Sequence, residues 1–426
     1  MLSVVRIRPV LRLLALGITG ILACSAAHAD AKPLKLPPSQ VQAFRNVRAV
    51  RITVKETLRG TNKRIEPHVR RVTTAILKAS GWSVAEAAPA SLEVDVSGKA
   101  WETEPAHPLT PEADQPDTVH HAKVAGQYAL SANRVKLVGR LSGTGNYPLD
   151  TFLASGYLES LVATLTALRK VPAHKLVEVV VKDENATVRR YGARVLSHFK
   201  EKESVPLLVP LLKDTDDLVR AEAAGALGDL GDPKAVEPLI ELVRRPGHGY
   251  DERAAIEALG MLGDPRAIVA LLEFLASLQD PPERDRHAQA WYRATGAVYG
   301  LSSSVTLPEF VKALKHADAK VRRLAIDRLK SLLRADGGQN LAAKDVSLLL
   351  DSMDALLATL ADADKDVRRS GAALLGTLGD GRALPALHRM AKSDPDEQVR
   401  NEARTAVNRI EWKQRESQAE PRGPQP

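Results

Sequence analysis

Residues 204–233 read SVPLLVPLLKDTDDLVRAEAAGALGDLGDP, and this stretch decides the fold. Apolar residues and prolines between Val205 and Leu212 predict a first helix, which the polar turn 213–217 ends. A second, alanine-rich helix starts at Val219-Arg220 and closes at a Gly-Asp-Pro turn. Neither helix can bury its apolar stripe alone, so the unit is stable only when stacked on copies of itself.

Further copies of the unit align on the Val-Arg pair, which recurs at Val188-Arg189, Val321-Arg322, Val367-Arg368 and Val399-Arg400. Three residues before each valine an Asn or Asp stands where it can cap the coming helix: Asn185, Asp216, Asp318, Asp364 and Asp396. Five residues before the valine comes Asp183, Asp214, Asp362 or Asp394, with His316 in one copy. We expect a mainly α fold: an α-solenoid of about seven helical pairs over residues 171–412.

The pattern resembles HEAT repeats, and the copies that turn at Gly-Asp-Pro look like the HEAT-like repeats named after phycobilisome lyases. The resemblance covers Val171 to Trp412 and concerns the repeat class. It implies a right-handed solenoid that binds a protein with the second helix of each pair. It implies nothing specific about the activity of the chain.

The arginines of the Val-Arg pairs allow two interpretations. In the structural one, which the resemblance implies, each arginine pairs with the turn aspartate of its own or an adjacent unit and fixes the stacking. In the functional one, the row of arginines grips an acidic partner. The balanced charge of residues 173–426, 38 basic and 39 acidic, favours the structural interpretation. The predicted ladder comprises Asp183, Arg189, Asp214, Arg220, Arg322, Asp362, Arg368, Asp394 and Arg400.

The region before the repeats predicts a small α+β domain over residues 45–170. Val50, Ile52 and Val54 alternate with charged residues as in a half-buried strand, and a helix follows up to Gly81. A second strand, a hairpin and a helix over 150–169 complete the domain. Basic residues are in excess in this region, mainly between Arg45 and Lys78. They suit either a solvated face or contact with an anionic envelope surface.

The N-terminus predicts an export signal. Three arginines precede the apolar run 13–23, and Ala27 and Ala29 form a small-x-small cleavage site. Cleavage there gives a soluble periplasmic protein starting at Asp30, with a linker over 30–44. In the rival interpretation Cys24, the only cysteine, ends a loose lipobox and makes the chain a membrane-anchored lipoprotein. No later stretch is apolar enough for a transmembrane helix, and residues 413–426 predict a disordered tail.

Motifs for chemistry are scarce. No His-Glu pair occurs, so the di-iron HEAT-repeat hydroxylases are not matched, and residues 139–145 lack the lysine of a phosphate loop. The balanced array makes no case for nucleic acid. We therefore expect an exported, non-enzymatic scaffold or adaptor without cofactor or metal. The alternative from another class is a lyase-like or enzyme-associated factor, by analogy with the relatives of these repeats.

The fourth repeat departs from the pattern and is the candidate binding site. A long charged turn precedes its second helix, which carries Trp291, Tyr292 and Arg293. Trp and Tyr often anchor interfaces, but an irregular repeat also needs large side chains to fill its own gaps. Adjacent helical positions point about 100° apart, so the two aromatic residues cannot share one core stripe. We expect at least one of them at the surface.

Overall fold

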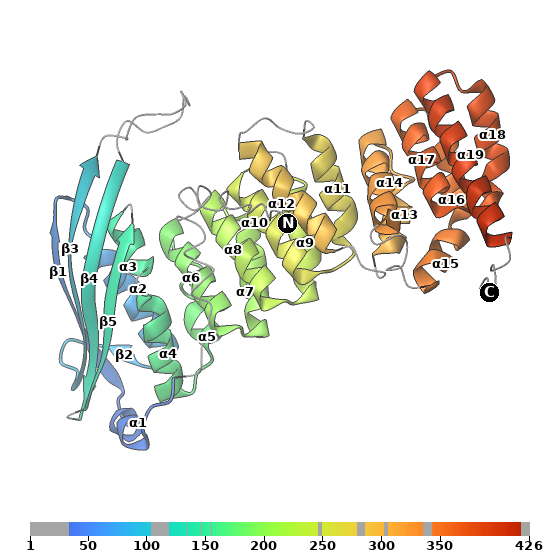
Figure 1. Cartoon of the computed structure of the whole chain (residues 1–426). Helices are drawn as coiled ribbons and strands as arrows, with labels where there is room; N and C mark the ends of the chain where they lie inside the picture. The colour runs from blue at the N-terminus through green and yellow to red at the C-terminus, as the bar shows by residue number, and fades with distance from the viewer. Residues whose placement is uncertain are drawn as a thin grey trace, which may run out of the picture. The chain divides into compact units, whose positions relative to one another are not determined.

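The computed structural model describes residues 34–103, 119–133, 135–145, 147–154, 156–245, 249–278, 286–301, 306–334 and 343–418. They divide into two compact units, one up to Leu207 and one from Leu208 (Figure 1). The prediction of a mainly helical repeat protein with a small N-terminal sheet domain is confirmed. Cys24, Ala27 and Ala29 lie outside the described residues, so the export signal remains a prediction. No helix in the described ranges is long and apolar enough to cross a bilayer.

A five-stranded sheet opens the first unit. It consists of β1 (Ala49–Arg59), β2 (Ser83–Val84), β3 (Ala90–Thr103), β4 (Val119–Ala132) and β5 (Val135–Gly145). The strand order is β2-β1-β3-β4-β5, with β1 parallel to β2 and β3 and the last three strands antiparallel. Parallel neighbours need a crossover, which the helix α2 (Glu66–Ala79) supplies.

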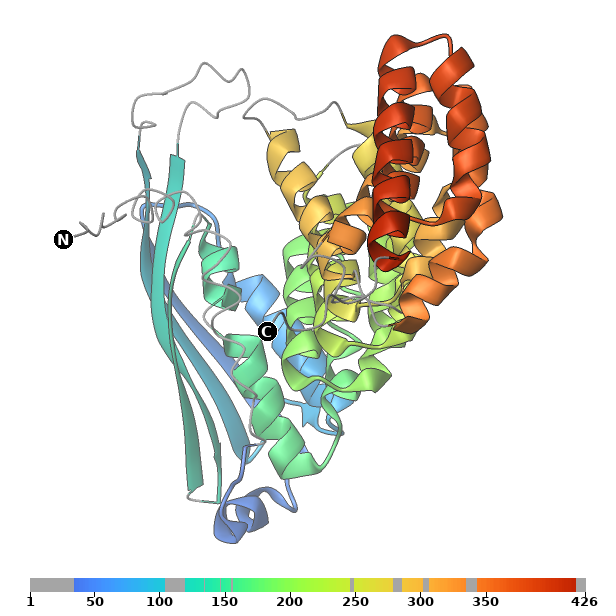
Figure 2. The same ribbon diagram turned by 45° about the vertical axis from the view of Figure 1, so that its right-hand side comes forward.

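Helices cover one face of this sheet and leave the other open (Figures 1 and 2). The covering helices are α2, α3 (Pro148–Ala154) and α4 (Tyr157–Arg169), while α1 (Pro38–Phe44) lies at one end of the strands, next to α4 (Figure 2). Side chains of a strand alternate between the two faces, so Leu92 and Val94 are fully buried while Glu93 and Asp95 are exposed. The predicted hydrophobic alternation therefore has the right register.

The single helix expected over residues 150–169 is two helices. Gly156 lies between α3 and α4 with φ at 84°, a left-handed conformation that glycine adopts without strain. The break lets Tyr157 enter the core, where it is fully buried and its hydroxyl lies 2.6 Å from that of Thr73. Burial raises the pKa of Tyr157, so this phenol stays neutral.

Helical pairs follow the sheet domain. The first unit holds α5 (Ala173–Val177) and α6 (Ala186–Phe199), and α7 (Val205–Leu208) contains the boundary between the units. The described elements of the second unit are α8 (Asp217–Leu230), α9 (Val236–Val243), α10 (Tyr250–Leu262), α11 (Ala267–Ser277), α12 (Arg286–Gly300), α13 (Leu307–Ala313), α14 (Ala319–Arg334), α15 (Ala343–Asp351), α16 (Met353–Ala358), α17 (Lys365–Leu378), α18 (Leu384–Ser393) and α19 (Glu397–Gln418). The helix α19 runs past Trp412, to which the sequence assigned the end of the repeats.

Local chemistry starts and ends the second helices as predicted. The side chain of Asp216 accepts the backbone N–H of Val219 at 3.0 Å, and Asp364 does the same for Val367. Gly231 closes α8 with φ at 66°, a position where a side chain would be strained. The caps fix the residue at which each second helix begins, and therefore which of its residues lie toward the neighbouring helices.

Glycine permits the close approach of neighbouring second helices. A Cβ on Gly228 of α8 would lie 2.8 Å from the Cα of Ala258 on α10, and one on Gly376 of α17 would lie 2.8 Å from the Cα of Ala406 on α19. Such distances are too short for a real contact, so a larger residue at either position would push the two helices apart.

Candidate partner-binding surface

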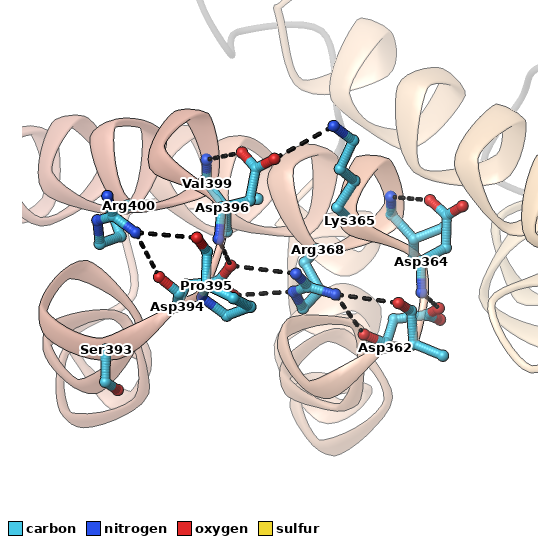
Figure 3. Close-up of polar contacts among 12 residues, drawn as sticks. Asp362, Asp364, Lys365, Arg368, Ser393, Asp394, Pro395, Asp396, Val399 and Arg400 are labelled. Atoms are coloured by element: carbon cyan, nitrogen blue, oxygen red, sulfur yellow. Dashed lines mark hydrogen bonds and ion pairs between the residues drawn. The ribbon is translucent and has the colours of Figure 1, made fainter.

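Three ladder arginines, Arg220, Arg322 and Arg368, join their own turn to the next repeat. Arg189 likewise donates to backbone oxygens of its own turn, those of Asp183 and Glu184, at 2.9 Å. Arg368 donates from Nη1 to the backbone oxygens of Asp362 and Ala363 at 3.0 and 3.1 Å (Figure 3). Its Nε and Nη2 donate to the carboxylate of Asp394 in the following unit, at 2.8 and 3.1 Å (Figure 3). One planar guanidinium thus holds a turn closed and clamps it to its neighbour.

The same arrangement recurs at two other arginines. Arg322 donates to the carboxylate of Asp362 at 2.7 Å through both Nε and Nη2, and Arg220 donates from Nε to Asp251 at 2.6 Å. Burial disfavours the charged carboxylate of Asp362, but the hydrogen bonds from Arg322 and from the backbone N–H of Asp364, together with the positive charges of Arg322 and Arg368, lower its pKa. The ion pairs are mostly buried, with 19% and 10% of the Arg220 and Asp251 side chains exposed. These arginines are therefore engaged in the stacking of the repeats.

The two ends of the ladder differ. Asp183, in the first helical pair, accepts from Nη2 of Arg71 at 2.7 Å and from Nε of Arg71 at 3.0 Å. Arg71 belongs to α2, so the sheet domain supplies the arginine that a preceding repeat would otherwise provide. At the C-terminal end Arg400 bonds only to the backbone oxygens of its own turn, at 2.7 and 3.2 Å, among the described residues.

The ladder changes in the third repeat. The sequences of the second helices α8 and α10 can be aligned on Ala226-Leu227-Gly228 and Ala258-Leu259-Gly260. In this alignment Glu252 stands at the position of Arg220. The same alignment places Asp251 where other units carry the buried valine, and this is the carboxylate that Arg220 reaches. The sequence prediction missed Asp251 because it expected the acceptor in the turn before the helix.

The ladder is interrupted after the fourth repeat. Alignment of Ala297-Val298 with Ala258-Leu259 places Trp291 at the arginine position of α12, and His316 replaces the turn aspartate of the next unit. Instead, Arg328 of α14 is almost fully buried and lies 3.8 Å from the centre of the Tyr299 ring. A cation–π contact thus links α12 and α14 at the place where the arginine–aspartate pair of the ladder is missing.

Large apolar side chains are exposed along three neighbouring second helices. Leu218 on α8, Tyr250 and Met261 on α10, and Tyr292 and Tyr299 on α12 are between 42% and 67% exposed. Tyr250 and Met261 are eleven residues apart and Tyr292 and Tyr299 seven, spacings that place each pair on one side of its helix. We call these five residues the second-helix face. Trp412, on α19, is the other large apolar residue that is exposed in the described part of the second unit.

Charged groups surround the second-helix face. Arg293 on α12 forms an ion pair with Glu257 on α10, and Arg253 lies 4.3 Å from the centre of the Tyr250 ring. Burial lowers the pKa of Arg293, and the nearby positive charge of Arg253 lowers it further. Arg293 thus helps to fix α12 against α10, a role that the sequence did not predict.

Trp291 and Tyr292 point in different directions, as the helical geometry predicted. Trp291 is half-buried, and its ring meets that of Tyr292 edge-on at 5.2 Å and 86°, whereas Tyr292 is 67% exposed. Gly296, one turn beyond Tyr292, has open space where a Cβ would lie. Burial by packing therefore accounts for Trp291 and leaves Tyr292 without such an explanation.

Most of the second-helix face could not be predicted from the sequence. Trp291, Tyr292 and Arg293 stand out there because they are adjacent in the chain. Leu218, Tyr250 and Met261 are scattered in the sequence, and the helices that carry them are neighbours, because α8 pairs with α10 and α10 with α12. Their signal is an apolar residue on the polar side of an amphipathic helix, which the helical period reveals once the buried side is known.

The repeats match two family models. The model described as HEAT repeats matches residues 173–253 and 307–408, and the model described as PBS lyase HEAT-like repeat matches residues 252–277. The array is therefore built of HEAT-like repeats of the PBS lyase type, as the resemblance implied. The gap in the first match, residues 254–306, contains α12 and most of α10, where the ladder departs from its pattern.

The chain is also similar to individual proteins. It is 34% identical over 85 residues to deoxyhypusine hydroxylase of Danio rerio, a match that covers 20% of this chain and 28% of that protein. Among solved structures it resembles the complex of CpcE and CpcF of phycocyanin lyase from Nostoc (22% identity, TM-score 0.28, 56% of this chain and 95% of that one). It also resembles human deoxyhypusine hydroxylase in complex with glycerol (21% identity, TM-score 0.25, 62% and 92%).

The expectation of a protein without enzymatic activity is wrong in the light of these similarities. The match to deoxyhypusine hydroxylase points toward enzyme-related families, although the chain spans about a quarter of that relative. The absence of a His-Glu pair excludes one metal motif only and says nothing about the relationship of the repeats to those of enzymes. In the described ranges, no group of three or more His, Cys, Asp or Glu side chains could hold a metal ion.

Proposed function

We propose that the chain is an exported HEAT-repeat scaffold that binds a protein partner through the second-helix face. The observation that carries the proposal is the concentration of five exposed large apolar side chains on α8, α10 and α12. Exposed apolar groups gathered on one face of a soluble protein commonly mark an interaction site. Tyrosine, the main residue of this face, is enriched among the residues that dominate binding energy.

The interrupted ladder supports the same location. A regular array gains stability from contacts between similar neighbouring repeats. Glu252 and Trp291 stand where other repeats have the ladder arginine, so these two repeats lack its contribution to stability. The fourth repeat recovers part of it with the Arg293–Glu257 ion pair and with Arg328 on Tyr299. It still exposes Tyr292, which takes part in neither of these two contacts. A partner that presents apolar side chains would cover the tyrosines, and the Arg253 and Glu257 side chains would form the polar rim.

Truncation of Tyr292 tests the proposed surface. We expect Tyr292→Ala to weaken binding of a captured partner about 30-fold, because removal of a central aromatic residue typically costs about 2 kcal/mol. The side chain is 67% exposed, so the variant should keep the circular dichroism spectrum and thermal midpoint of the wild type. Affinity is measured by titration of the partner, identified first by cross-linking from a photoreactive residue at position 292.

Trp412→Ala is the matched control. Trp412 is a large aromatic residue, 58% exposed, that lies on α19 rather than on the second-helix face. Its truncation should leave the affinity unchanged. Equal affinities for wild type and Tyr292→Ala, or equal losses in both variants, would refute the surface. Cross-linking of position 292 to a second copy of the chain would instead assign the face to self-association.

A second candidate function is a role in, or beside, an enzyme. The 34% identity to deoxyhypusine hydroxylase over 85 residues supports it. In that case the captured partner would be an enzyme, and its turnover would change when the chain is added. Tyr292→Ala would then reduce that change in proportion to the loss of affinity.

A further inference from the structure

We propose that the open face of the N-terminal sheet binds an anionic phospholipid bilayer. This outer face is made of the alternate residues of β1, β3, β4 and β5 that point away from the helices. Its described charged residues, all exposed, are Arg51, Lys55, Arg59, Lys99, Lys123, Lys136 and Arg140 with the acidic Glu93 and Asp95. The outer face thus carries seven positive and two negative side chains. The whole region 30–172 has 19 basic and 13 acidic residues, so its basic excess is concentrated on this face.

One row across the sheet carries three cations side by side. Arg59 on β1 lies opposite Lys99 on β3, and Lys99 lies opposite Lys123 on β4. Like charges directly opposite on neighbouring strands repel and destabilise a sheet. No ion pair joins any of the three to another described residue. An external anion would relieve this repulsion. The row therefore suits the binding of an anion better than a role in stabilising the sheet.

The row beside these cations forms a hollow. Its residues are small, with Ser97 on β3, Ala125 on β4 and Ser142 on β5 in register. With Asp95, Gln127 and Arg140 of the next row they line an open hollow of about 440 Å³. The hydroxyl of Ser97 donates to the backbone oxygen of Ala125 at 3.3 Å. The hollow carries one positive and one negative side chain, so the attraction for phosphate comes from the three-cation row beside it.

An aromatic pair borders the three-cation row on the other side. Trp101 stacks on His121 in the adjacent position of β3 and β4, with ring centres 5.3 Å apart and planes inclined by 17°. Trp101 remains 39% exposed. Tryptophan is enriched at membrane–water interfaces, where its amphipathic ring lies at the level of the headgroups. A broad cationic face with a tryptophan at its margin fits a layer of headgroups better than it fits one small anion.

The basic density that the sequence indicated between Arg45 and Lys78 is only partly available. Arg70 and Arg71 of α2 are held by Glu66 and Asp183. The proposal therefore places the anionic contact on the outer face, to which Arg51, Lys55 and Arg59 of this range belong. Residues 104–118, with four acidic side chains, lie outside the described residues and are not counted in the charge of this face. The choice of a bilayer over nucleic acid rests on the proposed export.

Binding to vesicles tests the proposal. The probe is phosphatidylcholine vesicles with and without 30 mol% phosphatidylglycerol, used with the chain from Asp30 onward so that the apolar run 13–23 is absent. The triple variant Arg59→Gln/Lys99→Gln/Lys123→Gln should bind the anionic vesicles about 100-fold more weakly than the wild type. Each cation near an anionic surface contributes about fivefold. Salt at about 1 M should abolish binding, because it shortens the Debye length to about 3 Å.

The matched control removes the same charge elsewhere. Lys35, Arg64 and Lys78 are exposed and lie off the outer face, so Lys35→Gln/Arg64→Gln/Lys78→Gln should bind nearly as the wild type. Equal losses in the two triple variants, or equal binding to neutral and anionic vesicles, would overturn the proposal. Competition by millimolar glycerol phosphate, or binding of single-stranded DNA in place of vesicles, would also overturn it. Partner affinity of the array should not change, which separates this result from the proposed protein-binding function.

Discussion

The arginine of the Val-Arg pair is the residue that organises the array. It donates to two carbonyl oxygens of its own turn and to the carboxylate of the next unit, as at Arg322 and Arg368. Lysine could not replace it, because a single ammonium group cannot span both partners with fixed geometry. The residue is thus selected for shape as much as for charge.

Arg220→Ala should lower stability without affecting binding. The change leaves Asp251 buried without its guanidinium, and the loss of such a partly buried pair costs about 1–3 kcal/mol. Thermal and urea unfolding measure the effect. Arg400→Ala is the control, because among described residues Arg400 bonds only within its own turn. A loss at Arg220 no greater than at Arg400, or a loss of partner affinity in folded Arg220→Ala, would contradict the structural role.

Residues with a short-range role could be predicted from the sequence. The caps at Asp216 and Asp364 depend on a side chain and a backbone N–H three positions away, so spacing alone reveals them. Asp251 could not be predicted as the partner of Arg220, because it stands 31 residues away in a repeat with altered spacing. The helical period predicted that at least one of Trp291 and Tyr292 is exposed, whereas the roles of Arg293 and Arg328 depend on neighbouring helices.

At the level of elements, two glycines on one helix have opposite roles. Gly228 and Gly225 both belong to α8, three residues apart. A Cβ on Gly228 would meet the backbone of Ala258, while a Cβ on Gly225 would meet nothing within 4 Å. The first is needed for the approach of α10, and the second only weakens the helix.

Gly228→Ala and Gly225→Ala should therefore change stability in opposite directions. Gly225→Ala should raise the free energy of unfolding by about 0.5–1 kcal/mol, because alanine is the better helix former. Gly228→Ala should lower it by about 1–3 kcal/mol, since the added methyl group overpacks the contact with α10. Urea unfolding of both variants measures the difference. A gain in stability at Gly228 would contradict the close approach of α8 and α10.

The elements of the sheet were harder to predict than those of the array. The alternation in β1 and β3 indicated strands, but the order β2-β1-β3-β4-β5 depends on pairing between distant segments. The three cations of the outer face come from residues 59, 99 and 123, and only the register brings them into one row. The break between α3 and α4 at Gly156 was also missed, because an isolated glycine is compatible with a continuous helix.

For the whole molecule, the place of action depends on residues outside the described ranges. We expect the mature chain to begin at Asp30, because the arginines and the apolar run precede Ala27 and Ala29 at the spacing of a cleavable signal. Intact-mass spectrometry of the protein purified from an envelope fraction measures this end. An acylated terminus at Cys24 would replace the soluble form with a lipoprotein, and an uncleaved chain in the cytoplasm would reject export.

The contact of Arg71 with Asp183 makes the two ends of the repeat array unequal as places where evolution could add a repeat. At its N-terminal end the acceptor aspartate is already occupied by a residue of the sheet domain. A duplicated repeat inserted there would have to displace α2, whereas one appended after α19 would find Arg400 ready to receive its aspartate. Lineages of this protein should therefore vary in repeat number at the C-terminal side. The sheet domain and the first helical pair should be inherited as one block.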